Sequence, residues 1–157
     1  MDKNSGINDL FSSPIFLSAI FSIFIAQLIK ALISIIRRKS SNPKSAYSAM
    51  LWSTGGMPSS HSAAVTALAT SVAFEEGLSS PLFVSLTIYA MIVIRDALGV
   101  RRSTGLQAKR INEIGEVLDE KYSLKYEKIK EVHGHNPAEV SVGVILGFFI
   151  AVAFCNL

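Results

Sequence analysis

The stretch Ser53-Thr54-Gly55-Gly56-Met57-Pro58-Ser59-Ser60-His61-Ser62-Ala63-Ala64 leads into a helical run of small apolar residues. Its two glycines let backbone N–H groups turn toward one point. Pro58 suits the first turn of a helix, and Ser59 or Ser60 suits its N-cap. Such a helix start attracts anions, and His61 adds a titratable ring. The pattern predicts a phosphate pocket with a proton donor, and the alternative is a capped helix with an ordinary histidine.

The composition is that of a membrane protein. The chain has 157 residues, 50% of them hydrophobic, with a mean hydropathy of +0.41 and a net charge of +3. These values indicate a single domain, 1–157, that is too apolar for an ordinary soluble protein. The one cysteine, Cys155, excludes an internal disulfide and a cysteine-based zinc cage.

Four apolar segments, 14–36, 60–77, 82–94 and 138–154, are the candidate spanning helices. The first has about the 20 residues needed to cross a bilayer. The second is rich in Ala, Ser and Thr, which suits a helix packed among other membrane helices. We therefore predict an all-α fold, a polytopic membrane helical bundle with about four spanning helices.

Two further segments are polar. Residues 1–13 are predicted to be a loosely ordered tail or a surface turn. Residues 103–134 are predicted to be a cytoplasmic helical connection, because Ile111, Ile114 and Leu118 are spaced three and four apart. We expect a break near Tyr122.

The basic residues lie in two connections, one between the first and second candidate spans and one between the third and fourth. In a chain with four spans, these two connections are on the same side of the membrane. The positive-inside rule assigns that side to the cytoplasm, and we expect the plasma membrane. Anionic lipid is the expected partner, and nucleic acid is not. Nothing in the sequence specifies an oligomeric state. The basic residues concerned are Arg37, Arg38, Lys39, Lys44, Arg101, Arg102, Lys109 and Arg110.

This topology brings cations, hydroxyls, helix starts and two histidines to one membrane face. Together these groups suit phosphoryl transfer, in which fixed donors stabilise spreading negative charge. One histidine can attack while the other protonates the leaving alkoxide. The predicted site residues are Lys30, Arg37, Ser59, Ser60, His61, Asp96, Arg101, Arg102, His135 and Glu139.

The runs 55–63, 96–102 and 134–140 resemble the divergent PAP2 membrane proteins, which are related to acid phosphatases and vanadium-dependent haloperoxidases. The resemblance covers residues 15–154 and implies metal-independent hydrolysis of a phosphomonoester without a cofactor. It implies that His135 attacks phosphorus, that Glu139 orients it and that His61 protonates the departing oxygen. By the same resemblance, the phosphate oxygens are held by Lys30, Arg37, Ser59 and Ser60.

The sequence departs from the wider PAP2 pattern at four positions. Arg38 replaces a proline, Ser60 a glycine and Glu139 an aspartate. Ile129 stands where the pattern has an arginine. The lost guanidinium is a bidentate phosphate clamp that Arg101 or Arg102 would have to supply from elsewhere.

Structural alternatives accompany several of these residues. Glu139 also fits a capping box, Asp96 an ion pair with a nearby arginine, and Lys30 a side chain that snorkels to the interface. The pair His133 and His135 also has the spacing of a metal site, but few acids lie near them and we predict no bound metal.

Two functions follow. The first is an integral membrane phosphatase acting on a lipid phosphate monoester such as phosphatidylglycerophosphate, phosphatidate or a polyprenyl phosphate or pyrophosphate. The second is a non-catalytic anionic-lipid-binding or transporter-associated membrane protein that keeps the phosphate pocket. The missing arginine favours the second, whereas two histidines at helix starts favour the first.

Overall fold

The computed structural model describes residues 3–37, 56–131 and 134–157. Every regular element within these ranges is an α-helix, which confirms the predicted all-α class. In chain order the helices are α1 (Lys3–Ser12), α2 (Pro14–Arg37), α4 (Ser60–Glu76), α5 (Pro81–Leu98), α6 (Val100–Tyr122) and α7 (Pro137–Cys155).

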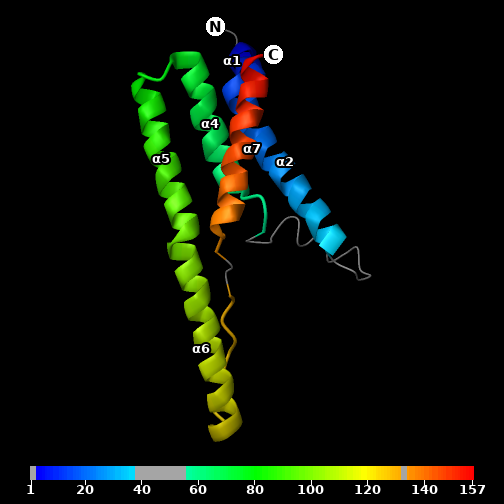
Figure 1. Cartoon of the computed structure of the whole chain (residues 1–157), viewed down its shortest axis with the longest axis vertical. Coiled ribbons are helices and arrows are strands. Elements are labelled where there is room, and N and C mark those ends of the chain that lie inside the picture. Colours follow the sequence, from blue (N-terminus) through cyan, green and yellow to red (C-terminus); the bar gives the residue numbers. More distant parts are fainter. Residues whose placement is uncertain (1–2, 38–55, 132–133) are drawn as a thin grey trace.

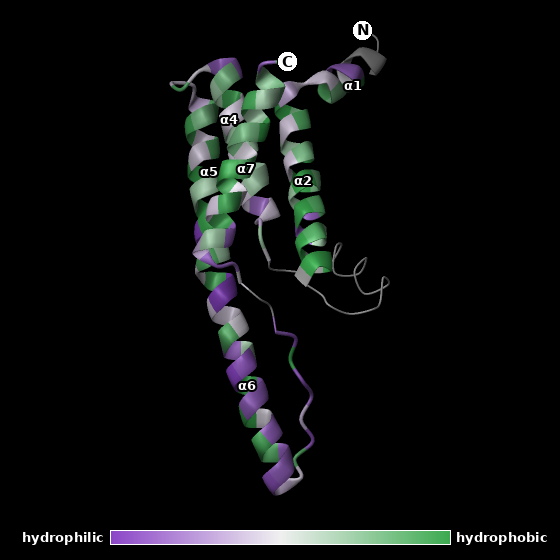
Figure 2. Cartoon of the chain, turned by 45° about the vertical axis from the view of Figure 1, so that its right-hand side comes forward, coloured by the Kyte–Doolittle hydropathy of each residue, from purple (hydrophilic) through white to green (hydrophobic). Residues whose placement is uncertain are grey.

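The helices α2, α4, α5 and α7 form a bundle in which α4 packs against the other three (Figure 1). Helices α2 and α5 run away from the end that holds both termini, and α4 and α7 run back toward it. In the part of the chain that the structure describes, three stretches are long and apolar enough to cross a membrane: Pro14–Ile33, Pro81–Tyr122 and Pro137–Cys155. In the second, the apolar part is α5, and Figure 2 shows the change to a hydrophilic surface along α6.

The helix α4 is shorter than these spans, with 17 residues, and is packed through small side chains. A Cβ built on Gly147 of α7 would overlap the carbonyl oxygen of Ala63, so the two helices are nearly in backbone contact. On the other side of α4, Ser18 of α2 and Ser71 share a 2.6 Å hydrogen bond between their hydroxyls. Close backbone approach and buried hydroxyl pairs stabilise helices against one another in lipid, as the composition of α4 predicted.

The expectation of a loose tail or turn at the N-terminus was wrong for Lys3–Ser12, which form α1. The apolar residues Ile7, Leu10 and Phe11 are spaced three and four apart, which is the helical period. The ring of Phe11 meets that of Phe16 of α2 edge-on, with 5.6 Å between the centroids, so the two helices are held together.

The connection 103–134 is only partly helical. Helix α6 continues almost directly from α5 and ends at Tyr122, where Ser123 takes a left-handed conformation with φ 53°. This confirms the expected break. Residues 123–131, called the strap from here on, contain no helix and run back along α6 toward the bundle (Figure 1). A helical connection through to residue 134 was therefore wrong, because side chains of α6 hold the strap extended.

Candidate functional site

The starts of α4 and α7 meet the α5–α6 junction at the end of the bundle away from the termini. The backbone N–H of Ser59 donates to the carbonyl oxygen of Glu139 at 2.9 Å. The backbone N–H of His135 donates to the carbonyl oxygen of Ala97 at 3.2 Å. Two of the sequence motifs and the end of α5 are thus joined by main-chain hydrogen bonds, while the expected meeting of all the predicted site residues stays a prediction.

His135 is buried and forms a pair with Glu139, which is partly buried. Nδ1 of His135 lies 2.9 Å from Oε2 of Glu139, one helical turn along, and His135 is only 6% exposed. An ionised carboxylate only accepts hydrogen bonds, so this contact favours the tautomer of the neutral ring in which Nδ1 carries the proton and Nε2 keeps its lone pair. Glu139 also accepts the backbone N–H of Asn136 at 3.2 Å, in a capping box. The capping and orienting interpretations of Glu139 therefore hold together.

Lys30 of α2 is buried beside this pair and interacts electrostatically with Glu139. Its stem passes Gly56, where a Cβ would lie 3.6 Å from Cγ of the lysine. Gly56, in the approach to α4, therefore lies against the aliphatic stem of Lys30. Lys30 faces the bundle. Simple snorkelling would instead require it to face only the membrane–water interface.

His61 lies in the first turn of α4, exposed, at the same end of the bundle. It is within electrostatic range of His135, Lys30, Asp96 and Arg101. One histidine is therefore buried and held by a carboxylate, and the other is open to exchange with its surroundings. An acid that must regain a proton in each cycle needs that openness.

Asp96 and Arg101 form the ion pair expected as the structural alternative, with Oδ2 and Nε 2.7 Å apart. Both side chains remain partly exposed. Arg101 is nevertheless among the charges that act on His61. Pairing therefore does not remove it from the group called the cluster from here on, which consists of Lys30, His61, Asp96, Arg101, His135 and Glu139. Arg102 is exposed, and its main chain is so close to Gly134 that a Cβ there would overlap it.

Ser59 is the N-cap of α4 and has no exposed surface. Its Oγ accepts the N–H of Ser62 at 3.4 Å and the hydroxyl of Ser62 at 3.0 Å. Ser60 is the first helical residue and is also buried. Pro58 lies before the cap, so its expected place in the first turn was wrong. Phosphate binding by Ser59 and Ser60 stays a prediction.

Some predicted residues lie outside what the structure describes, namely the side chain of Arg37 and all of Arg38, Gly55 and His133. Among residues 3–37, 56–131 and 134–157, no group of three or more His, Cys, Asp and Glu side chains could hold a metal ion.

Sequence reasoning missed the carbonyl of Ala97 and the role of Gly134. A backbone acceptor leaves no signal in residue identity. The glycine directly before His135 was a signal, because close backbone approach is a common reason for glycine in a connection.

The model of the divergent PAP2 family matches residues 11–150. The chain is also 43% identical over 147 residues to the uncharacterized membrane protein YuiD of Bacillus subtilis (strain 168), covering 87% of this chain and 90% of that protein. No solved structure matches the chain. The match spans the three motifs, α2, α4, α5, the strap and most of α7, so this chain belongs to the divergent PAP2 family of membrane proteins.

Proposed function

We propose that the protein is an integral membrane phosphatase that hydrolyses a lipid phosphate monoester through a phosphohistidine. The observation that carries this proposal is the buried contact between His135 and Glu139, placed beside Lys30 and within electrostatic range of His61. Binding an anion needs only cations, whereas this arrangement also supplies an oriented nucleophile and a second imidazole.

The chemistry follows from the tautomer of His135. Nε2 attacks phosphorus, the bond from phosphorus to the leaving alkoxide breaks, and protonated His61 gives its proton to that oxygen. Glu139 stabilises the positive charge that develops on the ring of His135. Water then attacks phosphorus, His61 takes a proton from the water, and the bond from phosphorus to Nε2 of His135 breaks, so that inorganic phosphate leaves and the free imidazole is restored. Lys30 and Arg101 stabilise the equatorial oxygens in both steps.

The position of Lys30 supports a lipid substrate. It lies inside the candidate span Pro14–Ile33, close to the end at which the cluster lies. A phosphate drawn to this cation is at interface depth, so its apolar tail can stay in the bilayer. Phosphatidylglycerophosphate, phosphatidate and polyprenyl phosphate or pyrophosphate are the candidates. The positive-inside rule supports a site at the cytoplasmic face, and the plasma membrane is the membrane that we propose.

A non-catalytic anionic-lipid-binding or transporter-associated role is the second candidate. Ile129, which stands where the wider pattern has an arginine, lies on the strap and contacts α6. Arg101, the nearest substitute, is already paired with Asp96. A site with fewer available guanidinium groups binds phosphate oxygens less specifically, which favours binding without turnover.

The deciding experiment is phosphate release by purified protein in detergent micelles containing each candidate lipid, with EDTA present. We expect release by the natural sequence and a loss of more than about a thousandfold in His135→Ala, with lipid binding retained. Trapping of labelled phosphate on His135 after acid-free quenching would support the covalent step. Lipid binding with equal inactivity of both proteins on every candidate would favour the second function.

A further inference from the structure

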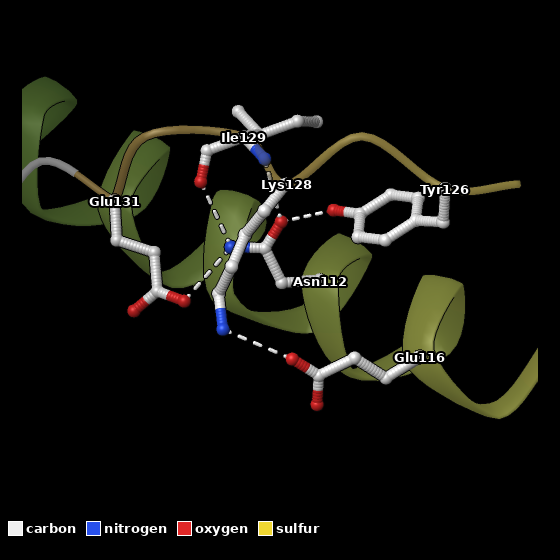
Figure 3. Close-up of polar contacts among 6 residues, drawn as sticks. All are labelled: Asn112, Glu116, Tyr126, Lys128, Ile129 and Glu131. Carbon is white, nitrogen blue, oxygen red and sulfur yellow. Dashed lines mark hydrogen bonds and ion pairs between the residues drawn. The ribbon is translucent and has the colours of Figure 1, made fainter. Parts of the chain in front are cut away.

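The strap is held against α6 by one buried amide. Asn112 is 2% exposed, although most of α6 faces solvent. Its Nδ2 donates to the carbonyl oxygen of Ile129 and to Oε1 of Glu131, both at 2.9 Å. Its Oδ1 accepts the N–H of Ile129 at 2.9 Å and the hydroxyl of Tyr126. Figure 3 shows these contacts converging on Asn112. Both donors and both lone pairs of the amide are used.

Two neighbouring contacts add to this attachment. A Cβ on Gly115 would overlap the ring of Tyr126, so the glycine lets the ring lie on the helix. Nζ of Lys128 lies 2.9 Å from Oε1 of Glu116 (Figure 3). The hydrogen bond to Glu116 raises the pKa of Lys128 above its ordinary value. This exposed ion pair contributes little beside the buried amide.

The strap leads directly to the candidate site. Ile129 is bound to Asn112. Farther along the chain, Gly134 lies against the main chain of Arg102, and the N–H of His135 donates to the carbonyl oxygen of Ala97. The ten residues from Arg102 to Asn112 measure about 15 Å along α6. The five chain steps from Ile129 to Gly134 reach at most about 17 Å. Because only five chain steps separate Ile129 from Gly134, the Asn112 anchor limits how far Gly134 and His135 can move from Arg102 and Ala97.

We propose that Asn112 is a positioning residue that, through the strap, holds His135 against the carbonyl of Ala97. Its effect on turnover rests on the proposed phosphatase function, but its effect on the mobility of His135 does not. Removing the amide leaves the main chain of Ile129 without partners and frees the strap. His135 then loses its fixed relation to α5, while α4 and α7 remain packed.

The test compares Asn112→Ala with Lys109→Ala, a change at an exposed residue one turn away. Hydrogen exchange followed by mass spectrometry reports the backbone N–H of His135 in the full-length protein in detergent. We expect exchange at least about tenfold faster at His135 and in the strap for Asn112→Ala, and no change for Lys109→Ala. In Asn112→Ala, we expect the rate of hydrogen exchange within α4 to equal that of the natural protein. Tyr126→Phe, which loses one of the four bonds, gives an intermediate increase.

Unchanged exchange at His135 in Asn112→Ala, or acceleration throughout α4 and α7, would overturn the proposal. If phosphatase activity is found, kcat falls at least about tenfold in Asn112→Ala while KM changes less, because binding cations are untouched. If the natural protein releases no phosphate, the phosphatase proposal fails and the exchange result alone still decides the role of Asn112.

Discussion

The backbone N–H of Ser59 donates to the carbonyl oxygen of Glu139 at 2.9 Å, joining the start of α4 to the start of α7. The two residues are far apart in the sequence, and each lies beside a histidine motif. A Cβ on Gly143, one turn beyond Glu139, would come within 2.5 Å of the carbonyl oxygen of Ser59. The two helix starts are therefore fixed relative to each other by backbone contact. This contact also fixes the relative positions of the cluster side chains that the two helix starts carry.

Glu139→Gln should lower turnover by about ten- to a hundredfold, since the amide oxygen keeps the capping contact but loses the charge that stabilises the ring of His135. Steady-state phosphate release measures this. Thermal stability should hardly change, because Gln also serves at this position of a capping box. Glu139→Ala should in addition lose about 1 kcal/mol of stability with the cap. Equal activity of Glu139→Gln and the natural protein would remove Glu139 from the mechanism.

His61→Ala should slow hydrolysis of an alkyl phosphate by about a hundredfold or more, because the leaving alkoxide then departs without a proton. An aryl phosphate with an acidic leaving group needs no such proton, so its phosphoryl group should be transferred to His135 at nearly the natural rate. Comparing the single-turnover rates of phosphohistidine formation from the two substrates separates loss of the acid from general damage, because His61 serves again only when water attacks. An equal loss on both substrates contradicts the assignment.

Asp96 and Arg101 are expected to act as a unit, with the carboxylate holding the guanidinium toward the cluster. Arg101→Ala should weaken phosphate binding by about tenfold, through the loss of a charge-assisted hydrogen bond. Asp96→Asn should have a smaller effect alone and none in the Arg101→Ala background. Inhibition by inorganic phosphate across this double-mutant cycle measures the coupling. Additive effects would give Asp96 a separate role in the site.

Gly147→Ala should destabilise the bundle by about 1–3 kcal/mol, because the added methyl group overlaps the carbonyl of Ala63. Gly6→Ala is the matched control, since a Cβ there meets nothing within 4 Å and alanine favours the helix α1. Thermal unfolding in detergent, followed by circular dichroism, compares the two. A similar transition temperature for both variants would mean that α7 moves away from α4 without cost.

Hydrophobic length and local pattern were enough to predict the membrane bundle, its helix order and the break after Tyr122. Each of these depends on residues close together in the chain, as does the capping box of Asn136 and Glu139. The N-terminal helix was missed because its helical pattern of apolar residues extends over only Ile7, Leu10 and Phe11 and because most of its other residues are polar. The strap was missed because its conformation comes from Asn112, whose partners are 14 to 19 residues away.

The sequence by itself determined which residues offer cations, imidazoles and hydroxyls, and it predicted that four spans would place them at one membrane face. Only the tertiary structure decided that Ser59 and not Ser60 is the N-cap, that Arg101 is the arginine paired with Asp96, and that Ala97 holds the main chain of His135. These are outcomes of competition for hydrogen-bond partners. A side chain or backbone group takes whichever partner the packed helices bring within reach, and that choice is made by distances between helices and not by spacing along the chain.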